Sequence, residues 1–213
     1  MPHKHDVVYL HGFASSPQSN KAQFFRRKLN EQGVAVDIPR LDGGHFESLT
    51  ISSQLKIVHE TVAGRSVLLM GSSLGGYLAA LYAARHPEIA GLVLLAPGFQ
   101  FPSRWRQRYT PEELDRWKRE GSTPVYHYGE KRELRLGHQL LEDSERYEDE
   151  PDARQPALIF HGTQDDVVPA EVSQAFVATH PNASLHLMDS GHELTDVLEP
   201  MWVKVDVFRR ALC

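Results

Sequence analysis

Short apolar runs alternate with amphipathic segments along most of the chain. Each run is apolar at nearly every position, which is typical of strands buried on both faces of a parallel sheet. The segments between them place apolar residues at helical spacing. This alternation predicts a mostly parallel sheet of about six strands with helices on both faces. We expect the strands at residues 7–10, 34–38, 67–70, 91–96, 157–160 and 184–188, and helices at about 19–30, 49–64, 77–84, 170–179 and 194–211.

The pattern changes between residues 99 and 155. This segment is rich in charged residues, has scattered aromatic side chains and contains no apolar run typical of a strand. Thr110, Pro111 and Glu113 form a capping-box pattern, which predicts a helix that continues to about Glu120. A second helix is expected from about 133 to 146. We interpret residues 99–155 as a short helical cap inserted into a single domain that spans residues 1–213.

The strand at 67–70 leads into a glycine-rich turn and then into an alanine-rich helix. The turn carries Gly-x-Ser-x-Gly in one register only, with Ser73 at its centre between Gly71 and Gly75. A nucleophile elbow has this form, because its serine takes a strained backbone conformation that exposes the hydroxyl above the sheet. The strand and the helix come so close at such a turn that the two positions have no room for a side chain, which only glycine satisfies.

Composition limits the classes of function. The chain has 213 residues, of which 41% are hydrophobic and 24% charged, and a net charge of −5. The acidic balance argues against nucleic acid as a partner. The one cysteine, Cys213, allows no intrachain disulfide, and the first residues lack an apolar signal region. No apolar run is long enough to span a membrane. These features predict a cytoplasmic protein and indicate no particular oligomeric state.

Residues able to do chemistry follow four of the predicted strands. His11, Gly12 and Phe13 follow the first strand, Ser73 the third, and Asp165 and His192 the last two. In open α/β sheets, ligands bind at the carboxyl ends of the strands. A serine nucleophile needs a histidine base, and that histidine needs a carboxylate that fixes its tautomer. The chain order of serine, aspartate and histidine is the one expected of an α/β hydrolase.

These motifs together resemble the α/β-hydrolase-fold serine esterases, and specifically the compact bacterial esterases of the YqiA-like group. The matching pieces are Tyr-Leu-His-Gly-Phe-x-Ser-Ser-Pro at 9–17, Gly-Ser-Ser-Leu-Gly-Gly at 71–76, His-Gly-x-x-Asp-x-x-Val-Pro at 161–169, and Gly-His at 191–192. They extend over nearly the whole chain, and the insertion matches least. The resemblance implies the α/β-hydrolase fold and a carboxylesterase that acts on small-molecule esters without a cofactor.

The resemblance also assigns roles to residues of this chain. It implies that Ser73 is the nucleophile, His192 the general base and acid, and Asp165 the orienting carboxylate. The backbone N–H groups of Phe13 and Leu74 would form the oxyanion hole. We further expect Gly12 and the aromatic residues nearest the strand end in the insertion to contact the substrate; these are Phe99, Phe101 and Trp105. A cap of this length favours small or medium acyl groups.

Several alternatives stay open at this point. Asp166 could replace Asp165 as the carboxylate, or either could cap the following helix. His192 could be a solvated loop residue, and His45 could line the pocket, whereas we expect His11 and His161 to brace loops. No residues have the spacing of zinc ligands, and no phosphate-binding loop follows the first strand. The same machinery would cleave acyl-CoA thioesters, amides or carbon–carbon bonds, and a non-catalytic ligand-binding protein could keep the fold.

Overall fold

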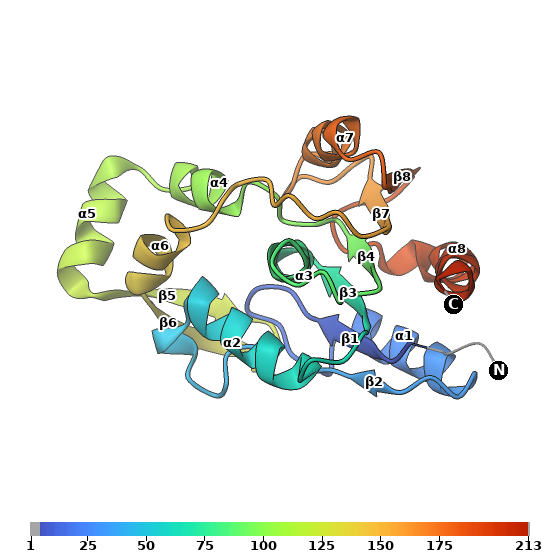
Figure 1. The fold of residues 1–213 in the computed structure, drawn as a ribbon. Coiled ribbons are helices and arrows are strands. Elements are labelled where there is room, and N and C mark those ends of the chain that lie inside the picture. Colours follow the sequence, from blue (N-terminus) through green and yellow to red (C-terminus); the bar gives the residue numbers. More distant parts are fainter. Residues whose placement is uncertain (1–4, 213) are drawn as a thin grey trace.

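The computed structural model describes residues 5–212, so Cys213 lies outside the described residues. A six-stranded sheet with the order β2-β1-β3-β4-β7-β8 forms its centre, and every pairing in it is parallel. This confirms the predicted parallel sheet (Figure 1). The strands are β1 (Val7–Leu10), β2 (Val36–Asp37), β3 (Leu68–Ser72), β4 (Gly91–Leu95), β7 (Ala157–Gly162) and β8 (Ala183–Met188).

Helices cover both faces of the sheet, as predicted. Helices α1 (Asn20–Asn30) and α8 (Leu198–Ala211) pack on one face, and α2 (Ile51–Val62), α3 (Leu74–Ala83) and α7 (Ala170–Thr179) pack on the other. Alternate strand residues enter two separate cores: Val7 and Tyr9 face α1 and α8, whereas Val8 and Leu10 face α2 and α3. Because both faces are covered, the central strands β1, β3, β4 and β7 are buried at every position.

Several predicted elements have different bounds in the structure. Strand β2, at one edge of the sheet, is only two residues long and pairs with β1 at Val36 and Asp37 alone. Strand β3 continues through Ser72, which brings the strand directly to the elbow. The closing helix is divided into a 3-10 turn, Thr195–Val197, and α8. Another 3-10 turn, Phe46–Ser48, precedes α2.

The segment between β4 and β7 contains helices and a β-hairpin. Its elements are α4 (Phe101–Gln107), α5 (Pro111–Glu120), β5 (Ser122–His127), β6 (Arg132–Gly137) and α6 (Gln139–Ser144). The capping box of α5 is present as predicted: Thr110 accepts from the Glu113 N–H, and the Glu113 carboxylate accepts from the Thr110 N–H.

The predicted helix at 133–146 is wrong, and the insertion is not purely helical. Residues up to Gly137 pair with β5 as an antiparallel strand, and the helix starts only after it. Leu134 and Leu136 lie opposite Val125 and Thr123 in this hairpin. Leu136 is fully buried, and Leu134 and Val125 pack against the same core. Burial of this apolar face therefore outweighs the helix propensity of the glutamate, leucine and arginine residues in the segment.

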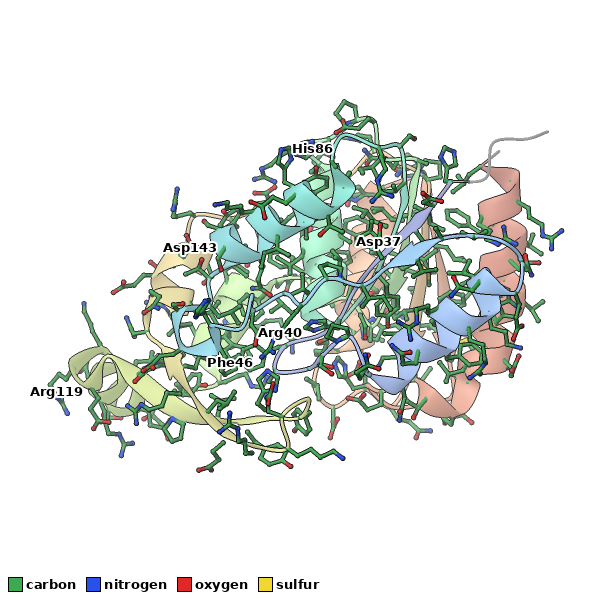
Figure 2. The ribbon with its side chains drawn as sticks, turned by 90° about the horizontal axis from the view of Figure 1, so that it is seen from below. Asp37, Arg40, Phe46, His86, Arg119 and Asp143 are labelled. Atoms are coloured by element: carbon green, nitrogen blue, oxygen red, sulfur yellow. The ribbon has the colours of Figure 1, made fainter. Side chains whose placement is uncertain are left out.

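The hairpin is attached to the core beside the loop that follows β1. The Gly129 N–H donates to the Ala14 carbonyl at 3.3 Å. Arg40 contacts the Glu130 carboxylate at 3.1 Å, and the Phe46 ring meets the edge of His127 at 4.7 Å. In Figure 2, Arg40 and Phe46 lie next to the hairpin, whereas Arg119 marks the far end of the inserted segment on α5. The hairpin thus forms a wall close to the carboxyl end of the sheet.

Candidate active site

Ser73 lies at the sharp turn between β3 and α3. Its backbone is left-handed, with φ 53° and ψ −121°. A residue with a side chain pays a strain energy of about 1–3 kcal/mol for such a conformation, which persists only where the surrounding structure enforces it. Here the Ser73 N–H donates to Leu95 of β4, and the Ser73 carbonyl accepts from the N–H groups of Gly76 and Gly98. These bonds hold the turn in place.

The glycines of the elbow are required by close backbone approach, as the sequence predicts. A Cβ on Gly75 would lie 2.1 Å from the Leu10 carbonyl oxygen, and a Cβ on Gly71 would lie 2.3 Å from the Gly75 oxygen. Real Cβ atoms do not come this close to backbone atoms. Gly75 therefore allows the elbow to pack against the end of β1, and Gly71 allows the strand and the helix of the elbow to approach each other.

The structure brings Ser73, His192 and Asp165 together from three loops. The Ser73 hydroxyl lies 3.0 Å from His192 Nε2, and His192 Nδ1 lies 2.8 Å from Asp165 Oδ2. If the Nδ1 proton bonds to the carboxylate, Nε2 is left as the acceptor for the serine proton. The Asp165 side chain has no exposed surface and that of His192 is 12% exposed. This arrangement places an imidazole nitrogen next to the Ser73 hydroxyl.

Four donors surround the Asp165 carboxylate. Oδ1 accepts from the N–H groups of Val167 and Val168 at 2.9 and 2.8 Å, and Oδ2 also lies 3.2 Å from His161 Nε2. Burial by itself would raise the pKa of Asp165, but the hydrogen bonds from His161, His192 and Val168 outweigh it and hold the pKa well below its usual range. Asp165 is therefore a carboxylate at neutral pH.

The neighbouring Asp166 is exposed and makes no hydrogen bond to His192 within the described residues. His161 is fully buried; its Nε2 also bonds to the Val168 carbonyl at 2.8 Å, and its Nδ1 lies 2.7 Å from the Ser173 hydroxyl. His11 likewise braces a loop, since its ring contacts the Gly12 carbonyl and the Leu41 N–H. The geometry thus favours Asp165 over Asp166 and confirms the bracing roles expected of His11 and His161.

Lys21 is a member of the site that sequence reasoning missed. Its ammonium is almost buried and donates to the Glu193 carbonyl at 2.6 Å, with the Glu193 carboxylate at 3.4 Å. Burial lowers the pKa of Lys21, and the Glu193 carboxylate opposes that shift. These bonds tie α1 to the loop that carries His192. No local sequence motif predicts this contact, because Lys21 and Glu193 are 172 positions apart in the chain.

Phe13 and Leu74 flank Ser73 from two different elements. Leu74 is the first residue of α3, where a helix leaves its N–H groups without intrahelical acceptors. Phe13 follows the end of β1 beyond Gly12, and a Cβ on Gly12 would lie 3.5 Å from the Ser73 Cβ. The loop after β1 therefore runs alongside the serine. The helix N-terminus adds a partial positive charge there.

A cleft of about 1170 Å³ opens above Ser73 and His192. Gly12, Phe13, Phe99, Phe101 and Trp105 all line it, as does the hairpin. Phe99 is fully buried and stacks on Phe176 at 4.3 Å, so it forms the floor. Trp105 meets Phe13 edge-on at 4.7 Å, and this contact connects α4 to the loop after β1. His45 is exposed and does not line the cleft.

Two further observations concern ligands and membranes. Within residues 5–212, no group of three or more His, Cys, Asp or Glu side chains is placed to hold a metal ion. The described helices are also too short or too polar for any of them to cross a bilayer.

Known proteins share the fold and, in part, the sequence. Monoacylglycerol lipase ABHD6 of Homo sapiens is 31% identical over 111 residues, which are 46% of this chain and 32% of that protein. The Xenopus laevis protein abhd6-A is 32% identical over 112 residues, 47% of this chain and 33% of that one. The chain therefore matches only about a third of the length of these curated relatives.

Solved structures match over almost all of the chain. Mouse alpha/beta hydrolase domain-containing protein 10 has a TM-score of 0.81 and 17% identity, and the match covers 98% of this chain and 90% of that one. Est1E of Butyrivibrio proteoclasticus, solved with ferulic acid bound, has a TM-score of 0.77 and 22% identity, and the match covers 95% of this chain and 90% of that one. These similarities show the α/β-hydrolase fold. A family model described as uncharacterised protein family UPF0227 matches residues 6–209, and the chain belongs to that family.

Proposed function

We propose that this protein is a serine hydrolase that cleaves carboxylic esters through an acyl-enzyme. The observation that carries the proposal is the continuous chain of hydrogen bonds from Asp165 through His192 to Ser73, with the serine on a strained elbow. A serine, a histidine and a carboxylate in this order form an activated nucleophile. A binding protein would not require this alignment.

In the first half of the reaction, Ser73 Oγ attacks the acyl carbon while its proton moves to His192 Nε2. The imidazolium that forms is stabilised by the buried carboxylate of Asp165. The N–H groups of Phe13 and Leu74 donate hydrogen bonds to the oxyanion that forms from the carbonyl oxygen, aided by the N-terminus of α3. His192 then gives its proton to the leaving alcohol, and the acyl group stays on Ser73.

In the second half, a water molecule takes the place of the alcohol. His192 Nε2 removes a proton from this water, which attacks the acyl-enzyme, and the same two N–H groups hold the second oxyanion. Collapse releases the acid and returns the proton from His192 to Ser73. Every step uses groups of this chain and water, so the proposed reaction requires no cofactor.

The names of the relatives fit this class of reaction. ABHD6 is named a monoacylglycerol lipase, and Est1E was solved with ferulic acid. The cleft of about 1170 Å³ is larger than a small acyl group needs. The predicted preference for small or medium acyl groups therefore stays a prediction that a chain-length series tests. An acyl-CoA thioester would be cleaved by the same steps, with a thiol as the leaving group.

The direct test is hydrolysis of 4-nitrophenyl esters of increasing chain length by the wild type and by Ser73→Ala. We expect turnover that peaks at short or medium chains and is lost in the variant. Activity retained by Ser73→Ala would refute the assignment of the nucleophile. A folded wild type that hydrolyses no ester would favour another bond type or a binding protein.

A further inference from the structure

The charge that lines the cleft is opposite to that of the whole chain. The chain carries a net charge of −5, with 28 acidic and 23 basic residues. The cleft, in contrast, is lined by four cationic side chains and one acidic side chain. The acidic one, Glu193, is already paired with Lys21. This leaves an excess of three positive charges around the opening, from Arg104, Arg108 and Lys131.

Arg104 and Arg108 lie one turn apart on the same side of α4 and its C-terminal end, and they repel each other. Arg104 donates to the Val167 carbonyl at 2.6 Å, close to the loop of Asp165. The Arg108 guanidinium lies over the Trp105 ring, 5.4 Å from its centre. Burial, and then the charge of Arg108, lowers the pKa of Arg104. Both guanidinium groups are thus fixed at the wall of the cleft.

Neither of these two arginines forms an ion pair with an acidic side chain in the described part of the chain. Their neighbour Arg106 forms an ion pair with Glu145, and neither of these two residues lines the cleft. The hairpin repeats the contrast: Glu130 pairs with Arg40, whereas the adjacent Lys131 lines the cleft. Glu145 and Glu130, the acidic partners of Arg106 and Arg40, thus do not line the cleft, whereas Arg104, Arg108 and Lys131, which form no ion pair within the described residues, do.

A cleft lined by one sign of charge concentrates ions of the opposite sign, so this cleft attracts anions from solution. Guanidinium groups match the planar geometry of carboxylate and phosphate oxygens and bind them with two parallel hydrogen bonds. We infer that the substrate is an ester that carries a second, anionic group, a carboxylate or a phosphate, and that Arg104 and Arg108 bind this group. The inference rests on the proposed function and adds the class of substrate to it.

The test compares matched neutral and anionic esters. For a charge on the acyl side, the pair is 4-nitrophenyl pentanoate and mono-4-nitrophenyl glutarate; for the leaving-group side, it is methyl 4-acetoxybenzoate and 4-acetoxybenzoate. We expect kcat/KM for the anionic member of at least one pair to exceed that of the neutral member by about tenfold or more at low salt. Competitive inhibition by butanoate and by propyl phosphate then shows which oxyanion binds better.

Variants connect the preference to the two arginines. In Arg104→Gln/Arg108→Gln we expect the preference to disappear while the neutral esters are still hydrolysed. Arg106→Gln is the matched control on the same helix and should keep the preference. Equal rates for both members of both pairs, or a preference that survives in the double variant, would overturn the inference.

Failure of the proposed function gives a different result. In that case none of the four esters is turned over, and calorimetric binding of butanoate and propyl phosphate still tests the arginines. Tighter binding to the wild type than to the double variant would support the anion site without catalysis. Binding to neither protein would contradict it.

Discussion

Replacing Asp165 by asparagine tests the geometry of the site most informatively, because the two side chains have the same shape. The N–H groups of Val167 and Val168 point at Oδ1, so the amide oxygen must take that position. The NH₂ group then replaces Oδ2 and faces His192 Nδ1. It becomes the donor in that bond, and His192 must carry its proton on Nε2 instead.

The wrong tautomer disables the base. A histidine with its proton on Nε2 donates to Ser73 Oγ and has no lone pair to accept the serine proton. The same change in a serine protease lowers kcat by about 10⁴-fold, which corresponds to about 5.4 kcal/mol at 1.36 kcal/mol per factor of ten. His161 adds to the loss, because its Nε2–H, held by the Val168 carbonyl, would also face the NH₂ group.

The assay is kcat for a 4-nitrophenyl ester, measured for the wild type, Asp165→Asn and Asp166→Asn. Asp166 is the adjacent exposed carboxylate and provides the matched control, for which we expect nearly full activity. Thermal melting of each protein shows whether it is folded. If a folded Asp165→Asn keeps more than about a tenth of kcat, or if Asp166→Asn loses as much, the reasoning from tautomers fails.

Two further predictions concern stability. Gly75→Ala should lower the free energy of unfolding by about 3 kcal/mol or more, because the new Cβ would lie 2.1 Å from the Leu10 oxygen. Gly33→Ala should lower it by only about 1–2 kcal/mol, the cost of the left-handed backbone, since no atom lies within 4 Å of the new Cβ. Equal losses for the two variants in urea unfolding would contradict this. Because folding lowers the pKa of Asp165, its contribution to the free energy of unfolding is present above its unfolded pKa of about 3.9 and is lost as the pH falls further. The difference in this free energy between the wild type and Asp165→Asn should therefore shrink below about pH 4, and a difference that stays constant to pH 2 would argue against it.

The sheet and the elbow were predictable because their signals are local and strong. Buried parallel strands are apolar at every position, and Ser73 follows such a strand within a fixed pattern of glycines. Asp165 and His192 follow β7 and β8, which are neighbours in the sheet and are separated from β3 by β4 alone. Each of these features is determined by a few consecutive residues, so a single sequence is enough to predict it.

The hairpin was not predicted because its signal is weak. Only one face of β5 and β6 is covered, and their charged residues alternate with a few apolar ones such as Val125, Leu134 and Leu136. The period of two from Leu134 to Leu136 was the available clue, but helix-forming residues around it favoured the other interpretation. Contacts such as the ion pair of Lys21 with Glu193 join residues that meet only when the chain is folded, so no local sequence pattern predicts them.

Labelling with a serine-directed fluorophosphonate tests the central claim most directly, since it requires an activated serine but no knowledge of the substrate. We expect one adduct per chain, mapped by peptide mass spectrometry to Ser73, both in the wild type and in Ser72→Ala. Ser72 is the matched control, because it is the adjacent serine and is buried at the end of β3. Ser73→Ala and His192→Ala should stay unlabelled. No adduct on the folded wild type, or an adduct that persists in Ser73→Ala, would contradict the account.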